Sequence, residues 1–168
     1  MLKKMAKTAT LALAVATLPG AASAAVGPDA AACRPGANSP AVLVYVDGFQ
    51  RRTGNVRVNV YGADRAKFLA RGQYVRQINL PVSRAGAMQI CVALPHAGRY
   101  AVAVRHDQDG NGHSGWSDGG GFSRNPRLSL TSLRPSYESV AINVGPVPIP
   151  VDVVLNYRFG LSVHPVRG

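Results

Sequence analysis

The segment 106–118, HDQDGNGHSGWSD, gathers three of the eight carboxylates of the chain into one glycine-rich stretch. Counted from Asp107, it has the spacing D-x-D-x-N-G-x5-D, that of a calcium-binding loop with aspartate in place of the closing glutamate. Ca²⁺ prefers about six to eight oxygen ligands, and glycine at the sixth position permits the sharp turn. The pattern predicts ligation by the side chains of Asp107, Asp109, Asn111 and Asp118 and by the backbone carbonyl of His113.

The same residues also fit a loop without metal, in which Asp and Asn side chains bond their own backbone in Asx-type turns. A strand-like segment leads into the loop, whereas the usual calcium loop lies between helices. The net positive charge of the chain also opposes a dication. If Ca²⁺ binds, we expect a dissociation constant of about 10⁻⁴–10⁻³ M. The sequence leaves both interpretations open.

A catalytic role for this segment is not expected. Ser114 in GHSGW fails the nucleophile pattern G-x-S-x-G, because Trp116 stands at the last glycine. The four histidines lack a metal-binding spacing such as H-E-x-x-H. A hydrolase built on His106, Asp107 and Ser114 is the minor alternative. We expect His106 to cap the loop, and Trp116 to anchor it rather than to stack on a sugar ring.

The N-terminus has the features of a secretory signal peptide over 1–24. Lys3, Lys4 and Lys7 precede an apolar run, and Ala22-Ser23-Ala24 supplies a small-residue cleavage site. We therefore expect an exported protein, periplasmic or extracellular, with no transmembrane segment because no later stretch is sufficiently long and apolar. Nothing in the sequence indicates the oligomeric state.

Cys33 and Cys91 are the only cysteines in the chain. An even number in an oxidising compartment favours one disulfide between them. Lipidation of Cys33 is the alternative, but the better cleavage site lies upstream of it.

The chain is basic, with a formal net charge of +11. The cations concentrate in 51–84, where Asp64 is the only acid, so this region could bind an anionic envelope glycolipid or polysaccharide through Arg51, Arg52 and Arg57. A solvated arginine-rich face is the simpler explanation. Nucleic acid is not an expected partner, because no aromatic residues interleave with the arginines to stack on bases.

The elements that must position these residues have the pattern of β-strands. Val56, Val58 and Val60 alternate with polar residues, and Ile90, Val92 and Leu94 are expected opposite Cys91. Strands are expected at 41–47, 55–61, 73–82, 88–94, 98–106, 137–144 and 149–157, with a short helix possible at 63–70. About seven strands predict an all-β, antiparallel two-sheet β-sandwich, immunoglobulin-like or prealbumin-like. We assign 25–40 to a linker, 41–160 to the sandwich and 161–168 to a C-terminal tail.

The order of motifs resembles a known family. GRYAVAVRHDQDGNG, then GGGFSRNP and RPSYESVAINV, are similar to exported bacterial domains called domain of unknown function 2141. The resemblance covers roughly 42–157 and implies a secreted β-sandwich without an established activity. The residues that match the family motif are His106, Asp107, Asp109, Asn111, Gly112, Gly121, Phe122, Ser123 and Asn125. The chain departs from the family pattern at His113, where lysine is usual, and at Arg124, which separates Ser123 from Asn125.

Overall fold

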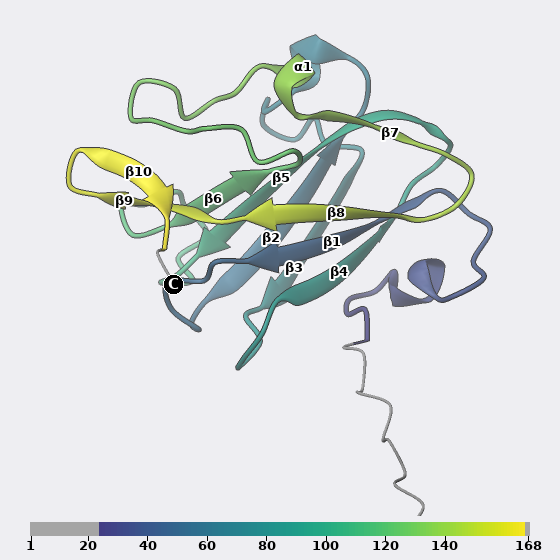
Figure 1. The fold of residues 1–168 in the computed structure, drawn as a ribbon, viewed down its shortest axis with the longest axis horizontal. Coiled ribbons are helices and arrows are strands. Elements are labelled where there is room, and N and C mark those ends of the chain that lie inside the picture. Colours follow the sequence, from purple (N-terminus) through teal and green to yellow (C-terminus); the bar gives the residue numbers. More distant parts are fainter. Residues whose placement is uncertain (1–23, 167–168) are drawn as a thin grey trace, which may run out of the picture.

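The computed structural model describes residues 24–166 and is all-β, with two sheets (Figure 1). The expected signal peptide lies almost wholly outside these residues. The strands are β1 (Ala41–Asp47), β2 (Asn55–Tyr61), β3 (Arg76–Pro81), β4 (Met88–Ala93), β5 (Gly98–Asp107), β6 (Gly119–Phe122), β7 (Ala141–Val144), β8 (Ile149–Val154), β9 (Asn156–Phe159) and β10 (Ser162–Pro165). Short helical turns occupy η1 (Ala30–Cys33), η2 (Arg65–Lys67) and α1 (Tyr137–Val140).

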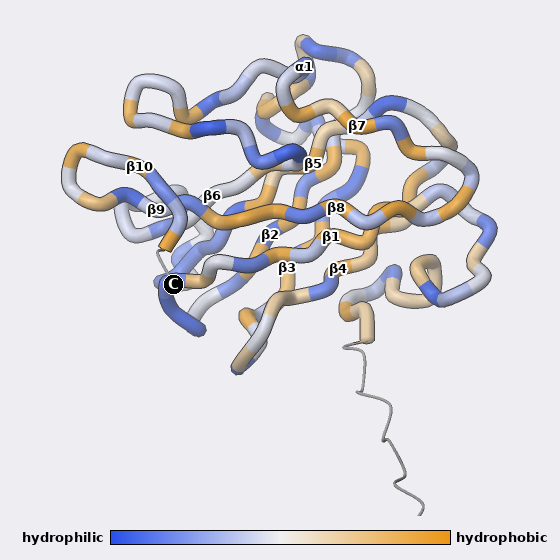
Figure 2. The backbone as a smooth tube through the Cα atoms, viewed as in Figure 1, coloured by the Kyte–Doolittle hydropathy of each residue, from blue (hydrophilic) through white to orange (hydrophobic). Residues whose placement is uncertain are grey.

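The first sheet has three strands in the order β4-β1-β8, and the second has seven. In the second sheet the order is β10-β9-β6-β5-β2-β3, and β7 pairs with β5. The alternating valines of β1, β2 and β5 face the space between the sheets and form the main core. Figure 2 shows the apolar stretches of β1 and β8 in the front layer. The two-sheet, all-β expectation is therefore confirmed.

Several elements differ from the expected pattern. β8 pairs with β1 in parallel, not antiparallel. It lies at a sheet edge, which tolerates Pro150 because no further strand within residues 24–166 pairs with the outer side of β8. The expected strand 137–144 begins as the helical turn α1, because the Ser136 side chain accepts a hydrogen bond from the Ser139 N–H. The expected strand 149–157 divides into β8 and β9 at Leu155, and the expected helix at 63–70 contracts to η2.

The segment 25–40, assigned to a linker, lies against β4. Val26 forms a parallel bridge to Ile90, and Cys33 forms a disulfide with Cys91, with a Cα–Cα distance of 5.9 Å. Cys91 lies on the face of β4 opposite Ile90 and Val92, as expected, and this segment buries it. At the other end of the chain, β10 extends the sheet beyond the expected boundary at 160.

No helix within residues 24–166 is long and apolar enough to cross a bilayer.

Candidate functional site: the loop 107–118 and the adjoining cavity

His106, the last residue before the loop, is fully buried and bonded through both ring nitrogens. Its Nδ1 lies 2.7 Å from the Tyr157 hydroxyl, and its Nε2 lies 2.8 Å from the carbonyl oxygen of Thr53. The carbonyl can only accept, so Nε2 carries the proton and Nδ1 accepts from Tyr157. Burial lowers the pKa of His106 and raises the pKa of Tyr157 to about 12. His106 therefore holds the base of the loop as a neutral side chain.

The turn before β2 also packs against the base of the loop. The Thr53 hydroxyl donates to the carbonyl of Gln108 at 2.9 Å. Gly54 has a φ of +72°, and a Cβ there would lie 1.8 Å from the Asp107 carbonyl oxygen, so this close approach requires glycine. Hydrogen bonds also join the two ends of the loop. The side-chain amide of Gln108 donates to the Ser117 carbonyl, and the backbone N–H of Gln108 donates to Asp118 Oδ1.

Above this base, three of the predicted ligands converge. One carboxylate oxygen each from Asp107, Asp109 and Asp118 lies within 4.8 Å of the other two. Asp107 is buried, Asp118 is half-buried and Asp109 is exposed. The carboxylates therefore run from the base of the loop to its surface.

Asp107 is the most unusual of the three. Its Oδ2 accepts from the Gly112 N–H at 2.9 Å and lies 3.4 Å from the Arg105 guanidinium. Its Oδ1 is buried and has no hydrogen-bond partner among residues 24–166. Burial alone raises the pKa of Asp107, but the Gly112 N–H, the contact with Asp109 and the charge of Arg105 together hold that pKa below its ordinary value. The site thus contains an ionised carboxylate with an unsatisfied oxygen.

The remaining predicted residues of the loop have other partners. Asn111 Oδ1 accepts from the His113 N–H at 2.7 Å, and Asp109 Oδ1 accepts from the Asn111 N–H at 3.1 Å, so the expected Asx turns are present. Ser114 accepts from Arg105 at 3.1 Å and is not paired with His106. Trp116 is 73% exposed, so the expectation that it anchors the loop was wrong.

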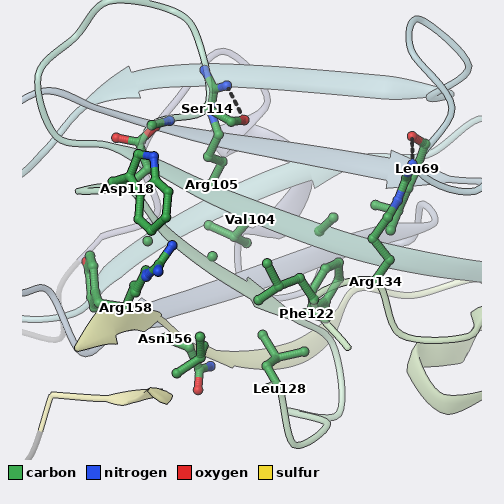
Figure 3. A pocket seen from close by; sticks show the side chains of 18 of the residues that line it. Leu69, Val104, Arg105, Ser114, Asp118, Phe122, Leu128, Arg134, Asn156 and Arg158 are labelled. Carbon is green, nitrogen blue, oxygen red and sulfur yellow. Dashed lines mark hydrogen bonds between the residues drawn. The ribbon is translucent and has the colours of Figure 1, made fainter. Parts of the chain in front are cut away.

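A cavity of about 540 Å³ adjoins the loop on the outer face of the seven-stranded sheet. Figure 3 shows Arg105, Asp118 and Arg158 on one side of it and Arg134 on the other, with Phe122 and Leu128 between them. Asp118 belongs to both the carboxylate cluster and the cavity wall. The sequence did not predict this cavity, because its lining residues come from segments that are far apart in the chain.

The three arginines predicted to bind an anionic partner have different surroundings. Arg51 and Arg52 are exposed in the β1–β2 loop, where Arg52 donates to the Gly86 carbonyl at 2.6 Å and stacks on Phe49. Arg57 lies in β2 opposite Arg105 of β5. Its buried Nε has no partner among residues 24–166.

The motif residues after the loop make contacts with the scaffold of the sandwich rather than with the carboxylates. The buried Ser123 hydroxyl accepts from the Val102 N–H and donates to the Val140 carbonyl. Asn125 binds the outer edge of β8 through the Val154 N–H at 2.8 Å and the Asp152 carbonyl at 3.2 Å. A Cβ on Gly121 would lie 2.7 Å from the Val154 carbonyl oxygen, so glycine allows β6 to approach β8. The motif residues therefore divide into a scaffold group and a carboxylate loop.

Comparison with known protein families identifies a match over most of the sandwich. The family model described as an uncharacterized protein conserved in bacteria, domain of unknown function 2141, matches residues 44–150. No curated protein and no solved structure shows significant similarity to the chain.

Proposed function

The chain belongs to this family of uncharacterized bacterial proteins, and because the family description assigns no activity, we propose a function from the geometry of the loop. The protein is an exported, non-catalytic β-sandwich module, periplasmic or extracellular, whose loop 107–118 binds Ca²⁺. One observation carries this proposal. Three carboxylates of one loop lie together, and the buried one has an oxygen without a hydrogen bond.

The distances between the carboxylate oxygens are short enough for all three to bind one ion. Ca²⁺ binds oxygens at about 2.3–2.6 Å, so two ligands of one ion lie at most about 5 Å apart. The three carboxylate oxygens of the cluster lie within 4.8 Å of one another, so they satisfy this condition without a change of backbone conformation. A cation would also supply Asp107 Oδ1 with the partner that its burial requires, since an unsatisfied buried oxygen costs about 1–3 kcal/mol.

The neighbouring charge limits the affinity. Arg105 lies 3.4 Å from Asp107 Oδ2 and partly neutralises the cluster. The backbone N–H groups that already bind Asp109 and Asp118 compete for the same lone pairs. We therefore expect a dissociation constant of about 10⁻⁴–10⁻³ M, as in other extracellular calcium modules.

Thermal unfolding of the chelator-treated protein tests the proposal. About 10 mM Ca²⁺ over a ~0.1 mM site adds roughly 2.7 kcal/mol to the free energy of unfolding, or a rise of roughly 5–10 °C in Tm. Mg²⁺ should give a much smaller rise, because it requires a tighter octahedral shell and retains its waters. Asp109→Ala should abolish the Ca²⁺ effect without unfolding the protein, because Asp109 is exposed at the tip of the loop.

Asp152→Ala is the matched control, since Asp152 is an exposed carboxylate of β8 outside the cluster. This variant should keep the full Ca²⁺-dependent rise in Tm. If the wild-type melting curve is unchanged by millimolar Ca²⁺, the metal-free interpretation of the loop is correct and the proposal is wrong.

Binding of an anionic envelope glycolipid or polysaccharide through Arg51, Arg52 and Arg57 is the less supported alternative. Arg52 is already engaged by the Gly86 carbonyl and the Phe49 ring, and Arg57 lies in the seven-stranded sheet rather than in the β1–β2 loop.

A further inference from the structure

The cavity beside the loop is apolar along its middle. The side chains there come from β6 and from the loop after it, chiefly Phe122, Leu128, Leu130 and Leu133. A volume of about 540 Å³ lies within the range of about 300–1,000 Å³ that is usual for small-molecule sites. The β9–β10 hairpin contributes Arg158 and Val163 to the lining. Leu161 at the turn of this hairpin is 87% exposed. The cavity therefore favours an occupant with a hydrocarbon part.

The charge around the cavity is positive. Arg105, Arg134 and Arg158 line it against one acid, Asp118. Arg105 already pairs with Asp107, whereas Arg134 and Arg158 take part in no ion pair within residues 24–166. An occupant with one negative charge would complement this lining.

The two unpaired arginines are not equivalent. The Arg158 guanidinium lies over the Trp116 ring, 3.2 Å from its centroid, on the same side of the cavity as Asp118. Arg134 stands on the other side, where it donates to the Leu69 carbonyl at 2.9 Å. With its remaining N–H donors and no acid beside it in the lining, Arg134 is the better partner for an anion.

We propose that this cavity binds a single long-chain carboxylate, a monomeric anionic amphiphile. Its head group pairs with Arg134, and its alkyl chain runs over Phe122 and Leu128 toward Trp116. This site shares Asp118 and Trp116 with the loop 107–118, but the proposal does not depend on Ca²⁺ binding.

Gly120 offers a direct way to fill the cavity. It is the middle glycine of β6 and lines the cavity, and a Cβ there would meet nothing closer than the Val104 carbonyl oxygen at 3.8 Å. The backbone therefore has room for a Cβ at this position, and we expect the methyl groups of valine to occupy the space of the alkyl chain. Gly145 is the matched control, because a Cβ there meets nothing within 4 Å and the residue lies outside the cavity lining.

Trp116, the only tryptophan of the chain, lines the cavity and reports binding through its fluorescence. We would titrate the protein, in EDTA, with dodecanoate below its micelle concentration. Wild type should show a saturable change, and dodecyltrimethylammonium, which has the same chain but a positive head, should bind about tenfold more weakly or worse. Octanoate should also bind at least about tenfold more weakly, because it buries four fewer methylenes.

Two variants, each with a matched control, complete the test. Gly120→Val should weaken dodecanoate binding at least about tenfold, whereas Gly145→Val should not. Arg134→Gln should weaken it about tenfold, whereas Arg127→Gln, an exposed arginine of the same loop outside the lining, should not.

The proposal is overturned if dodecanoate gives no saturable signal, if the cationic amphiphile binds equally well, or if Gly120→Val and Arg134→Gln both bind like wild type. Binding to anionic phospholipid vesicles without binding of monomeric dodecanoate would also overturn it, because the face would then contact a membrane surface. All arms contain EDTA, so their failure leaves the Ca²⁺ proposal unaffected.

Discussion

Asp29, half-buried just before η1, and Asp107, buried at the end of β5, differ in how many of their oxygens are satisfied. Asp29 accepts from the Arg76 Nε at 3.0 Å, from the Arg76 Nη2 at 2.5 Å and from the Ala93 N–H at 3.0 Å, so both oxygens have partners. Among residues 24–166, Asp107 has partners for one oxygen only. Asp29 lies alone, whereas Asp107 stands beside two further carboxylates.

The difference follows from what each segment joins. Arg76 belongs to β3 and Ala93 to β4, the neighbouring edges of the two sheets, so Asp29 fastens the N-terminal segment across the side of the sandwich. The loop 107–118 is held at its base by His106 and Gln108 and further along by Arg105 of β5, which donates to Ser114. Asp29, both of whose oxygens have hydrogen-bond partners, is therefore a structural contact. Asp107, whose Oδ1 has no partner among residues 24–166, is the carboxylate that we propose to bind Ca²⁺.

The disulfide of the N-terminal segment should give the largest effect. Cys33 and Cys91 are 58 residues apart, and closing such a loop contributes about 2–4 kcal/mol to the free energy of unfolding. Cys33→Ser, Cys91→Ser and chemical reduction should therefore each lower Tm by roughly 5–15 °C in thermal unfolding. Two reactive thiols in the native, unreduced protein would contradict the disulfide, and with it the covalent attachment of the N-terminal segment to β4.

Sequence periodicity predicted most of the fold, because the valines of β1, β2 and β5 alternate clearly. It missed β6, whose sequence is GGGF, because glycine is disfavoured in strands. Gly119 and Gly121 are required for packing, since a Cβ on Gly119 would lie 2.4 Å from the Tyr157 ring and a Cβ on Gly121 2.7 Å from the Val154 carbonyl oxygen. The parallel pairing of β1 with β8 was also hidden, because residues remote in sequence form it.

The candidate site, like the fold, has one part that the sequence predicted and another that it did not. The spacing of Asp107, Asp109 and Asp118 within one loop was enough to predict that they lie together. The roles of Tyr157 and Thr53 at the base of that loop depend on contacts across more than 50 residues, which no local pattern encodes. The cavity, including Arg134 and Gly120, is likewise a product of tertiary packing.

Asp29→Asn should give an intermediate effect, because it removes a charge-assisted hydrogen bond to Arg76. We expect a loss of about 1–2 kcal/mol at neutral pH, measured by denaturant unfolding. The bond to Arg76 holds the pKa of Asp29 below its ordinary value of 3.8, although burial acts in the opposite direction. The contribution is therefore complete above about pH 4 and is lost as the pH falls through the folded-state pKa. A constant difference between the variant and wild type down to the acid limit would contradict this assignment.

Asp107→Asn should give the smallest effect on the metal-free protein. The variant loses the 3.4 Å contact with Arg105, but it also removes one of three neighbouring negative charges, so the two changes largely cancel. We expect the free energy of unfolding to change by less than about 1 kcal/mol in EDTA, whereas the stabilisation by about 10 mM Ca²⁺ should disappear. Asp29→Asn, which leaves the cluster intact, should retain that stabilisation in full. If Asp107→Asn instead destabilises the metal-free protein as strongly as Asp29→Asn, then Asp107 is a structural carboxylate like Asp29, and the distinction between the two segments is wrong.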